Sequence, residues 1–139
     1  MATTPESLAR THAFARVMGP WLVIVPGIII ARAPGMGDLA EQFFRSPLSV
    51  WFAGALLMFF GILIIAFHQF WSSVAAVIIS AFGWILALRG AVLMVAPDLY
   101  ERATVSMDSV PLIRVMFGLI VAMGIYLTYV GWLAKPASR

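Results

Sequence analysis

The stretch that decides the fold runs from residue 48 to residue 88, LSVWFAGALLMFFGILIIAFHQFWSSVAAVIISAFGWILAL, and is almost continuously apolar. The hydrocarbon core of a bilayer is about 30 Å thick, whereas one helix of this length would measure about 60 Å. The stretch must therefore fold back on itself. Near its middle lies one polar cluster: His68, Gln69, Ser72 and Ser73. We place a tight turn there and predict two membrane-spanning helices, at 48–67 and 73–96.

Two further apolar runs flank this stretch. The run 112–133 is bounded by Pro111 before it and by Lys135 and Pro136 after it, so it predicts another spanning helix. The run 17–33 predicts the first spanning helix, although it contains Pro20 and Pro26. Pro20 fits a first helical turn, whereas Pro26 removes a helix hydrogen bond and predicts a kink.

The run 17–33 also has features of a cleaved signal peptide. Basic residues precede it, and residues 31–33 have the small-x-small form of a cleavage site. However, Pro34 would follow the cut and Arg32 lies inside the motif, so we favour an uncleaved span. Upstream, Thr4 and Pro5 predict the N-cap and first turn of a short helix on the membrane surface.

The overall composition fits an integral membrane protein. Hydrophobic residues make up 63% of the 139 residues and charged residues only 11%, against about 45–50% and about 25% in soluble domains. These values exclude a soluble enzyme, a disordered tail and a nucleic-acid-binding module. The net charge of +3 comes from basic residues spread along the chain, which suits topology signals and lipid headgroup contacts. Because there is no cysteine, disulfides and thiolate metal sites are excluded.

The two halves of the chain resemble each other, which predicts an internal duplication. Equivalent positions lie 63 or 64 residues apart: Trp21 and Trp84, Gly27 and Gly90, Pro47 and Pro111, and Gly54 and Gly118. We place the first repeat at about 13–67 and the second at about 76–133, within a single membrane domain covering 1–139. Since each half crosses twice, the two hairpins have the same orientation and are related by an axis near the membrane normal. The fold prediction is an all-α bundle of four transmembrane helices with both long loops on one side.

An Asp-Leu-x-Glu element lies in each of these two loops. Asp38 is expected to cap a short helix while Glu41 reaches back to the cap, and Asp98 and Glu101 are expected to do the same. Each loop therefore predicts a short interfacial helix ending before Pro47 or Pro111. The same four carboxylates offer an alternative interpretation as a cation site, although capping explains them more simply.

The second half, over about residues 83–133, resembles the YjeT-type small bacterial inner-membrane proteins. The resemblance rests on five positions: Gly90, Pro97, Pro111, Arg114 and Gly118. The first half departs from it, with Val50 where Arg114 stands and Pro26 where Arg89 stands. The resemblance implies a two-helix membrane unit, duplicated here, and a bacterial inner-membrane location. It implies no chemistry, because that family has no activity that it would lend to this chain.

Few residues are candidates for a functional site. Arg89 is the one charge well inside a predicted span, which makes it a functional candidate by default. In a structural interpretation, its long side chain extends to a lipid phosphate or pairs with Asp98, Glu101 or Asp108. In a functional interpretation, it lines an anion path or contacts a partner protein. Haem ligation by His68 and His12 together is an alternative interpretation, but polarity at the helix turn is the simpler explanation for His68.

Small residues at helical spacing are the remaining feature. Gly83, Ala87 and Ala91 form one stripe on the third span, and Gly118 and Ala122 form another on the fourth. Such stripes bring helices close together, within the chain or between chains.

These observations predict a small non-catalytic membrane protein that needs no cofactor and no metal. Its partners would be the lipid bilayer and either another membrane protein or further copies of itself, and not nucleic acid. We expect an accessory or scaffold role; the alternatives are a small oligomeric transporter or channel with Arg89 near the path, and a membrane enzyme or haem carrier. Lys and Arg are divided evenly enough between the two sides that orientation stays open.

Overall fold

The computed structural model describes residues 4–106 and 109–134, and every regular element in this part of the chain is helical. Four helices are long and apolar enough to cross a membrane. They are α1 (Pro5–Ala31), α3 (Pro47–Phe67), α4 (Val74–Val95) and α6 (Val110–Thr128), the last continued by the π-helical turn η2 (Tyr129–Leu133). Two short helices, α2 (Met36–Phe44) and α5 (Pro97–Ser106), lie in the first and third loops. The predicted fold class is confirmed.

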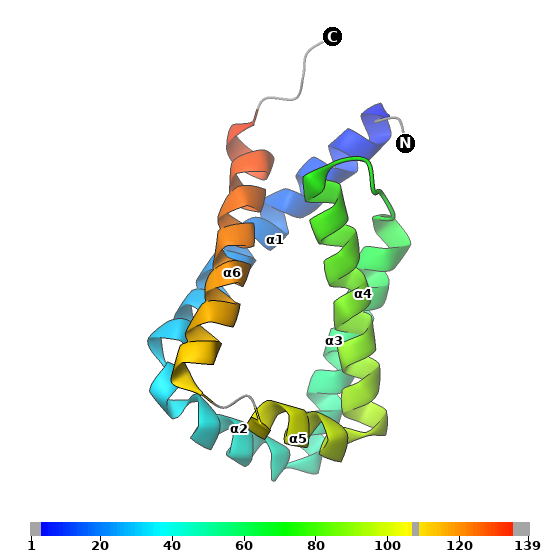
Figure 1. Ribbon diagram of the computed structural model, residues 1–139. Coiled ribbons are helices and arrows are strands. Elements are labelled where there is room, and N and C mark those ends of the chain that lie inside the picture. The colour runs from blue at the N-terminus through cyan, green and yellow to red at the C-terminus, as the bar shows by residue number, and fades with distance from the viewer. Residues whose placement is uncertain (1–3, 107–108, 135–139) are drawn as a thin grey trace.

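The long helices form two antiparallel pairs. Helix α3 packs along α4, and α1 packs along α6, although these last two helices are the most distant in sequence (Figure 1). Helices α2 and α5 lie together at one end of the molecule, whereas the start of α1, the end of α6 and the α3–α4 connection lie at the other (Figure 1). Each half thus runs through a spanning helix, a short helix and a spanning helix, with α1 parallel to α4 and α3 parallel to α6.

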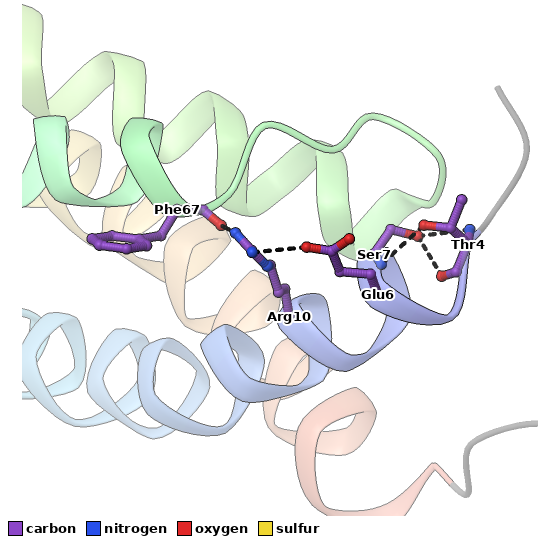
Figure 2. A network of polar contacts seen from close by, with 5 residues as sticks. All are labelled: Thr4, Glu6, Ser7, Arg10 and Phe67. Atoms are coloured by element: carbon purple, nitrogen blue, oxygen red, sulfur yellow. Dashed lines mark hydrogen bonds and ion pairs between the residues drawn. The ribbon is translucent and has the colours of Figure 1, made fainter.

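Polar residues at the helix starts explain where the chain turns. The Thr4 hydroxyl accepts from the Ser7 main-chain N–H at 3.2 Å, and the Ser7 hydroxyl accepts from the Thr4 N–H at 3.0 Å (Figure 2). Ser46 and Ser73 cap α3 and α4 through their hydroxyls, which accept from the main-chain N–H groups of Ser49 and Ala76. The expected short surface helix and the expected span 17–33 are in fact one helix of 27 residues that continues through both prolines.

Glycines set the spacing within each pair. A Cβ added at Gly61 would lie 2.3 Å from the main-chain nitrogen of Ala87, and one at Gly90 would lie 2.6 Å from the Gly54 carbonyl oxygen. In the other pair, a Cβ at Gly19 would lie 2.5 Å from the Thr128 nitrogen. Backbone therefore packs directly against backbone in both pairs, as small residues allow in membrane helices.

The hydrophobic core occupies the half of the molecule nearer the chain ends. Leu22, Ile79 and Leu127, from three different spanning helices, are essentially inaccessible and belong to one cluster. Large apolar side chains on the outer faces, such as Phe59 and Leu119, are exposed, as expected of surfaces that contact lipid rather than water.

The capping roles predicted for the loop carboxylates are wrong. Gly35 is the N-cap residue of α2 and Asp38 lies inside the first turn, because a 3₁₀ turn at Ala33–Gly35 starts the helix earlier. Asp98 likewise lies within the first turn of α5, which begins at Pro97. Both carboxylates still lie in the first turn of a helix, where a negative charge interacts favourably with the helix dipole. Glu41 forms an ion pair with Arg45 one turn later.

Candidate functional site

The half of the molecule nearer α2 and α5 is hollow. A cavity of about 630 Å³ lies between the two helix pairs, within the range typical of small-molecule sites. All six α-helices contribute apolar lining residues: Ile29, Phe43, Leu57, Leu93, Ala103 and Phe117 are examples. The spanning helices contribute residues from their halves nearest α2 and α5, as far as Leu57 in the middle of α3, and the core cluster fills the space beyond.

Among the described residues, Arg89 is the only charged one that lines this cavity. Its guanidinium donates a hydrogen bond to the Tyr100 hydroxyl and lies over the Tyr100 ring, with Cζ 5.3 Å from the ring centroid. Tyr100 also packs against Phe44 of α2, with ring centroids 6.2 Å apart. Arg89 thus leans from α4 toward the two short helices and holds its charge at the edge of an apolar space.

The carboxylates predicted as partners of Arg89 lie on a different face of α5. Asp98 and Glu101 line a separate cavity of about 270 Å³, whereas Tyr100 and Thr104 line the larger one. Residues one position apart on a helix point in different directions, so α5 turns its phenol toward Arg89 and its carboxylates away. The ion pairs formed among residues 4–106 and 109–134 are Glu6 with Arg10 and Glu41 with Arg45. Asp108 lies outside the described residues.

The four loop carboxylates do not assemble a metal site in the described part of the chain. No group of three or more His, Cys, Asp or Glu residues there is positioned to hold an ion. Asp38, Glu41 and Asp98 are exposed, and Glu101 is partly exposed.

His68 forms the most buried polar contacts in the chain. Its side chain is 0% exposed, and its two ring nitrogens lie 3.0 Å from the Thr11 hydroxyl of α1 and 3.0 Å from the Ser80 hydroxyl of α4. Phe14 and Phe70 pack edge-on against the ring. His68 therefore joins the two helix pairs at the end nearer the chain termini. Both ring nitrogens are occupied by hydroxyl groups, which leaves neither free to ligate haem.

The Ser80 hydroxyl places a proton on Nδ1 of this ring. It lies within donating distance of the carbonyl oxygens of Phe70 (2.9 Å) and His68 (3.1 Å), which can only accept. Nδ1 of His68 then donates to Ser80, and in the neutral ring Nε2 accepts from the Thr11 hydroxyl. Burial, helped by the positive charge of Arg10, lowers the pKa of His68 below its ordinary value of 6.5, although a backbone hydrogen bond opposes the shift.

Arg10 lies beside this histidine and ties α1 to the end of α3. Its guanidinium donates to the Phe67 carbonyl at 3.2 Å and forms an ion pair with Glu6 at 2.7 Å (Figure 2). The Phe67 carbonyl is one of the last in α3, where helix carbonyls lack main-chain donors.

The small-residue stripes fall into two environments. Gly83 and Ala87 lie in the α3–α4 interface, where a Cβ at Gly83 would lie 2.6 Å from the Ile64 side chain. Ala91 is partly buried. On α6, by contrast, Ala122 is exposed and a Cβ added at Gly118 would meet no atom within 4 Å. The stripe of Gly118 and Ala122 is thus an open face, which we call the α6 face.

Sequence reasoning found Arg89 but missed Tyr100, Thr11 and Ser80 as polar partners. A phenol or hydroxyl on a helix carries little signal unless the pairing of helices is known. Known proteins supply no further guide, because no protein-family model, curated protein or solved structure matches this chain.

Proposed function

We propose that this chain is a non-catalytic accessory or scaffold subunit of a membrane complex. Four spanning helices make it a small multi-pass membrane protein. The observation that carries the proposal is the α6 face, whose small residues face away from the other helices. Gly19, Gly61 and Gly90, by contrast, pack against a neighbouring helix of the same chain. A face of small residues allows another helix to approach closely, and no described residue lies within 4 Å of a Cβ added at Gly118.

The buried polar groups support a structural role rather than catalysis. His68, Thr11 and Ser80 satisfy one another, and in the described residues no buried side-chain nitrogen or oxygen is left without a partner. A reactive centre usually needs a group held ready for a substrate. Here the polar groups instead connect helices.

We further propose that the chain arose by duplication of a two-helix unit and works in a bacterial inner membrane. The matching order of elements supports duplication. The contacts are alike as well, because in each pair the first helix of one half packs through a glycine against the second helix of the other half: Gly19 against Thr128, and Gly83 against Ile64.

A small transporter or channel is the alternative, favoured by the cavity beside Arg89. A continuous path through one chain would require the cluster around Leu22, Ile79 and Leu127 to separate, because it fills the opposite half. Flux in liposomes that Arg89→Ala abolishes would favour this alternative over the scaffold role.

The size of the native particle after gentle extraction tests the scaffold proposal. We expect wild type to migrate in a particle larger than the monomer and Ala122→Trp to shrink it. Ala66→Trp, on an exposed position of α3, serves as the control and should change nothing. Recovery of all three chains as monomers would contradict the proposal.

A further inference from the structure

We infer that the 630 Å³ cavity is a binding site for an anionic phospholipid, with the lipid phosphate at Arg89 and part of an acyl chain between the helix pairs. The inference is independent of the scaffold role, since it concerns the inner space and not the α6 face. Three observations carry it: the charge of Arg89, the chemistry of the cavity wall and the position of the cavity along the helices.

The charge comes first. Arg89 carries a permanent positive charge, and within residues 4–106 and 109–134 its contact in the cavity is the Tyr100 hydroxyl rather than a carboxylate. A guanidinium has five N–H donors in a planar fork, and a single phenol oxygen uses only part of this capacity. Phosphate oxygens match that fork in a way that the phenol does not. The Tyr100 hydroxyl beside it can donate to the same phosphate.

The wall comes second. Apart from Arg89, Tyr100 and Thr104, the residues that line the cavity in the described part of the chain are apolar or glycine. The Thr104 hydroxyl donates to the Tyr100 carbonyl at 2.8 Å, so its hydrogen is engaged within α5. A small hydrophilic anion would leave most of this wall without a partner, whereas an acyl chain would cover it and release water from it.

The position comes third. Helices α2 and α5 lie at the end of the spanning helices (Figure 1), which is the level of the lipid headgroups in a bilayer. Arg89 leans toward them through its contact with Tyr100. The apolar lining from α3 and α6, such as Leu57 and Phe117, continues from there toward the bilayer interior. The charged end and the apolar part of the cavity are thus arranged in the order of a phospholipid headgroup and its chain.

Native mass spectrometry of the full chain in detergent tests this site. Phosphatidylglycerol is titrated against phosphatidylcholine of the same acyl composition, and bound lipid is counted per protein. We expect wild type to retain phosphatidylglycerol preferentially. Arg89→Gln should weaken this binding about tenfold, the loss expected for one charged hydrogen-bonding group, and Arg89→Lys should weaken it less. The control is Arg114→Gln, an exposed arginine on α6 outside the cavity, which should bind as wild type does.

A second pair of variants keeps Arg89 and fills the cavity. Ala53→Phe places a ring in the lining and should reduce bound phosphatidylglycerol, whereas Ala66→Phe, exposed on the same helix, should not. Thermal unfolding of each variant distinguishes loss of the site from loss of the fold. Equal losses from Arg89→Gln and Arg114→Gln, equal retention of both lipids, or displacement of the lipid by inorganic phosphate at comparable concentration would each overturn the inference.

Discussion

The Trp132 indole N–H donates to the main-chain carbonyl of Arg16 at 3.2 Å, and the Arg16 guanidinium in turn lies 5.9 Å from the centroid of the Trp132 ring. In a regular helix the Arg16 carbonyl would accept from residue 20, but Pro20 has no N–H to donate. On the other helix, Arg16 Nε donates to the Gly131 carbonyl at 2.7 Å, within the widened turn of η2. The irregular turns of α1 and of η2 at the end of α6 thus satisfy each other's main-chain carbonyl groups by hydrogen bonds.

Trp132→Phe should lower the free energy of unfolding by about 1 kcal/mol, since it keeps the ring but removes the N–H that satisfies the Arg16 carbonyl. Thermal unfolding in detergent measures the change. Trp51→Phe, at an exposed position of α3, is the matched control and should have little effect.

Pro20→Ala should make Trp132→Phe less damaging. With alanine at position 20, a main-chain N–H becomes available to the Arg16 carbonyl, and the indole is no longer its sole donor. A double-mutant cycle on unfolding free energies checks this. Additive effects would show that the proline and the tryptophan are not linked.

Gly61→Ala and Gly118→Ala should change stability in opposite directions. At Gly61 the new methyl group meets the Ala87 backbone at 2.3 Å, so α3 and α4 must separate, at a cost of about 1–3 kcal/mol. At Gly118 the methyl group meets no atom within 4 Å, and alanine favours a helix by up to about 1 kcal/mol. Unfolding in a mixed-detergent titration compares the two. A similar loss at both positions would contradict the arrangement of α6.

Stability should fall as the pH is lowered below about 6.5, because the fold disfavours the protonated form of His68. Burial lowers the pKa of His68 in the folded state, so the unfolded chain binds the proton more readily. The contribution of His68 to stability is therefore complete above the pKa that this residue has in the unfolded chain, and it is lost as the pH falls below that value toward the lower pKa of the folded state. Melting temperatures across this range measure the effect in wild type, and His68→Gln should flatten the dependence. His12→Gln is the control, and an equal flattening there would assign the effect elsewhere.

Single-cysteine labelling should place α2 and α5 on one side of the membrane and the α3–α4 connection on the other. The chain contains no cysteine, so each introduced thiol reports alone. With an impermeant maleimide on sealed vesicles, Gln42→Cys and Arg102→Cys should react from the same side and Gln69→Cys from the opposite side. Labelling of all three from one side would rule out four crossings.

The elements were readable from the sequence because each depends on local chemistry. Length and hydropathy, with Pro47 and Ser73 at helix starts, place α3 and α4 within one or two residues. The side-chain partners of the polar residues, by contrast, could not be predicted from the sequence. Whether Arg89 meets Tyr100 or Glu101 depends on which face of α5 turns inward, and the contact between Thr11 and His68 depends on α1 crossing toward α4. Pairing of helices in a bilayer is decided by fine steric fit, since all their surfaces are similarly apolar.

The pairing of α1 with α6 has a consequence for biogenesis. Helices α3 and α4 are neighbours in the chain and can close as a hairpin while synthesis continues, but α1 emerges from the ribosome well before the helix that it packs against. Until α6 is inserted, the Arg16 carbonyl lacks its donor and Gly19 faces lipid. A nascent chain arrested after α5 would therefore contain a packed α3–α4 hairpin and an α1 that lacks its packing partner. Membrane proteases and insertion chaperones would encounter the chain in this form.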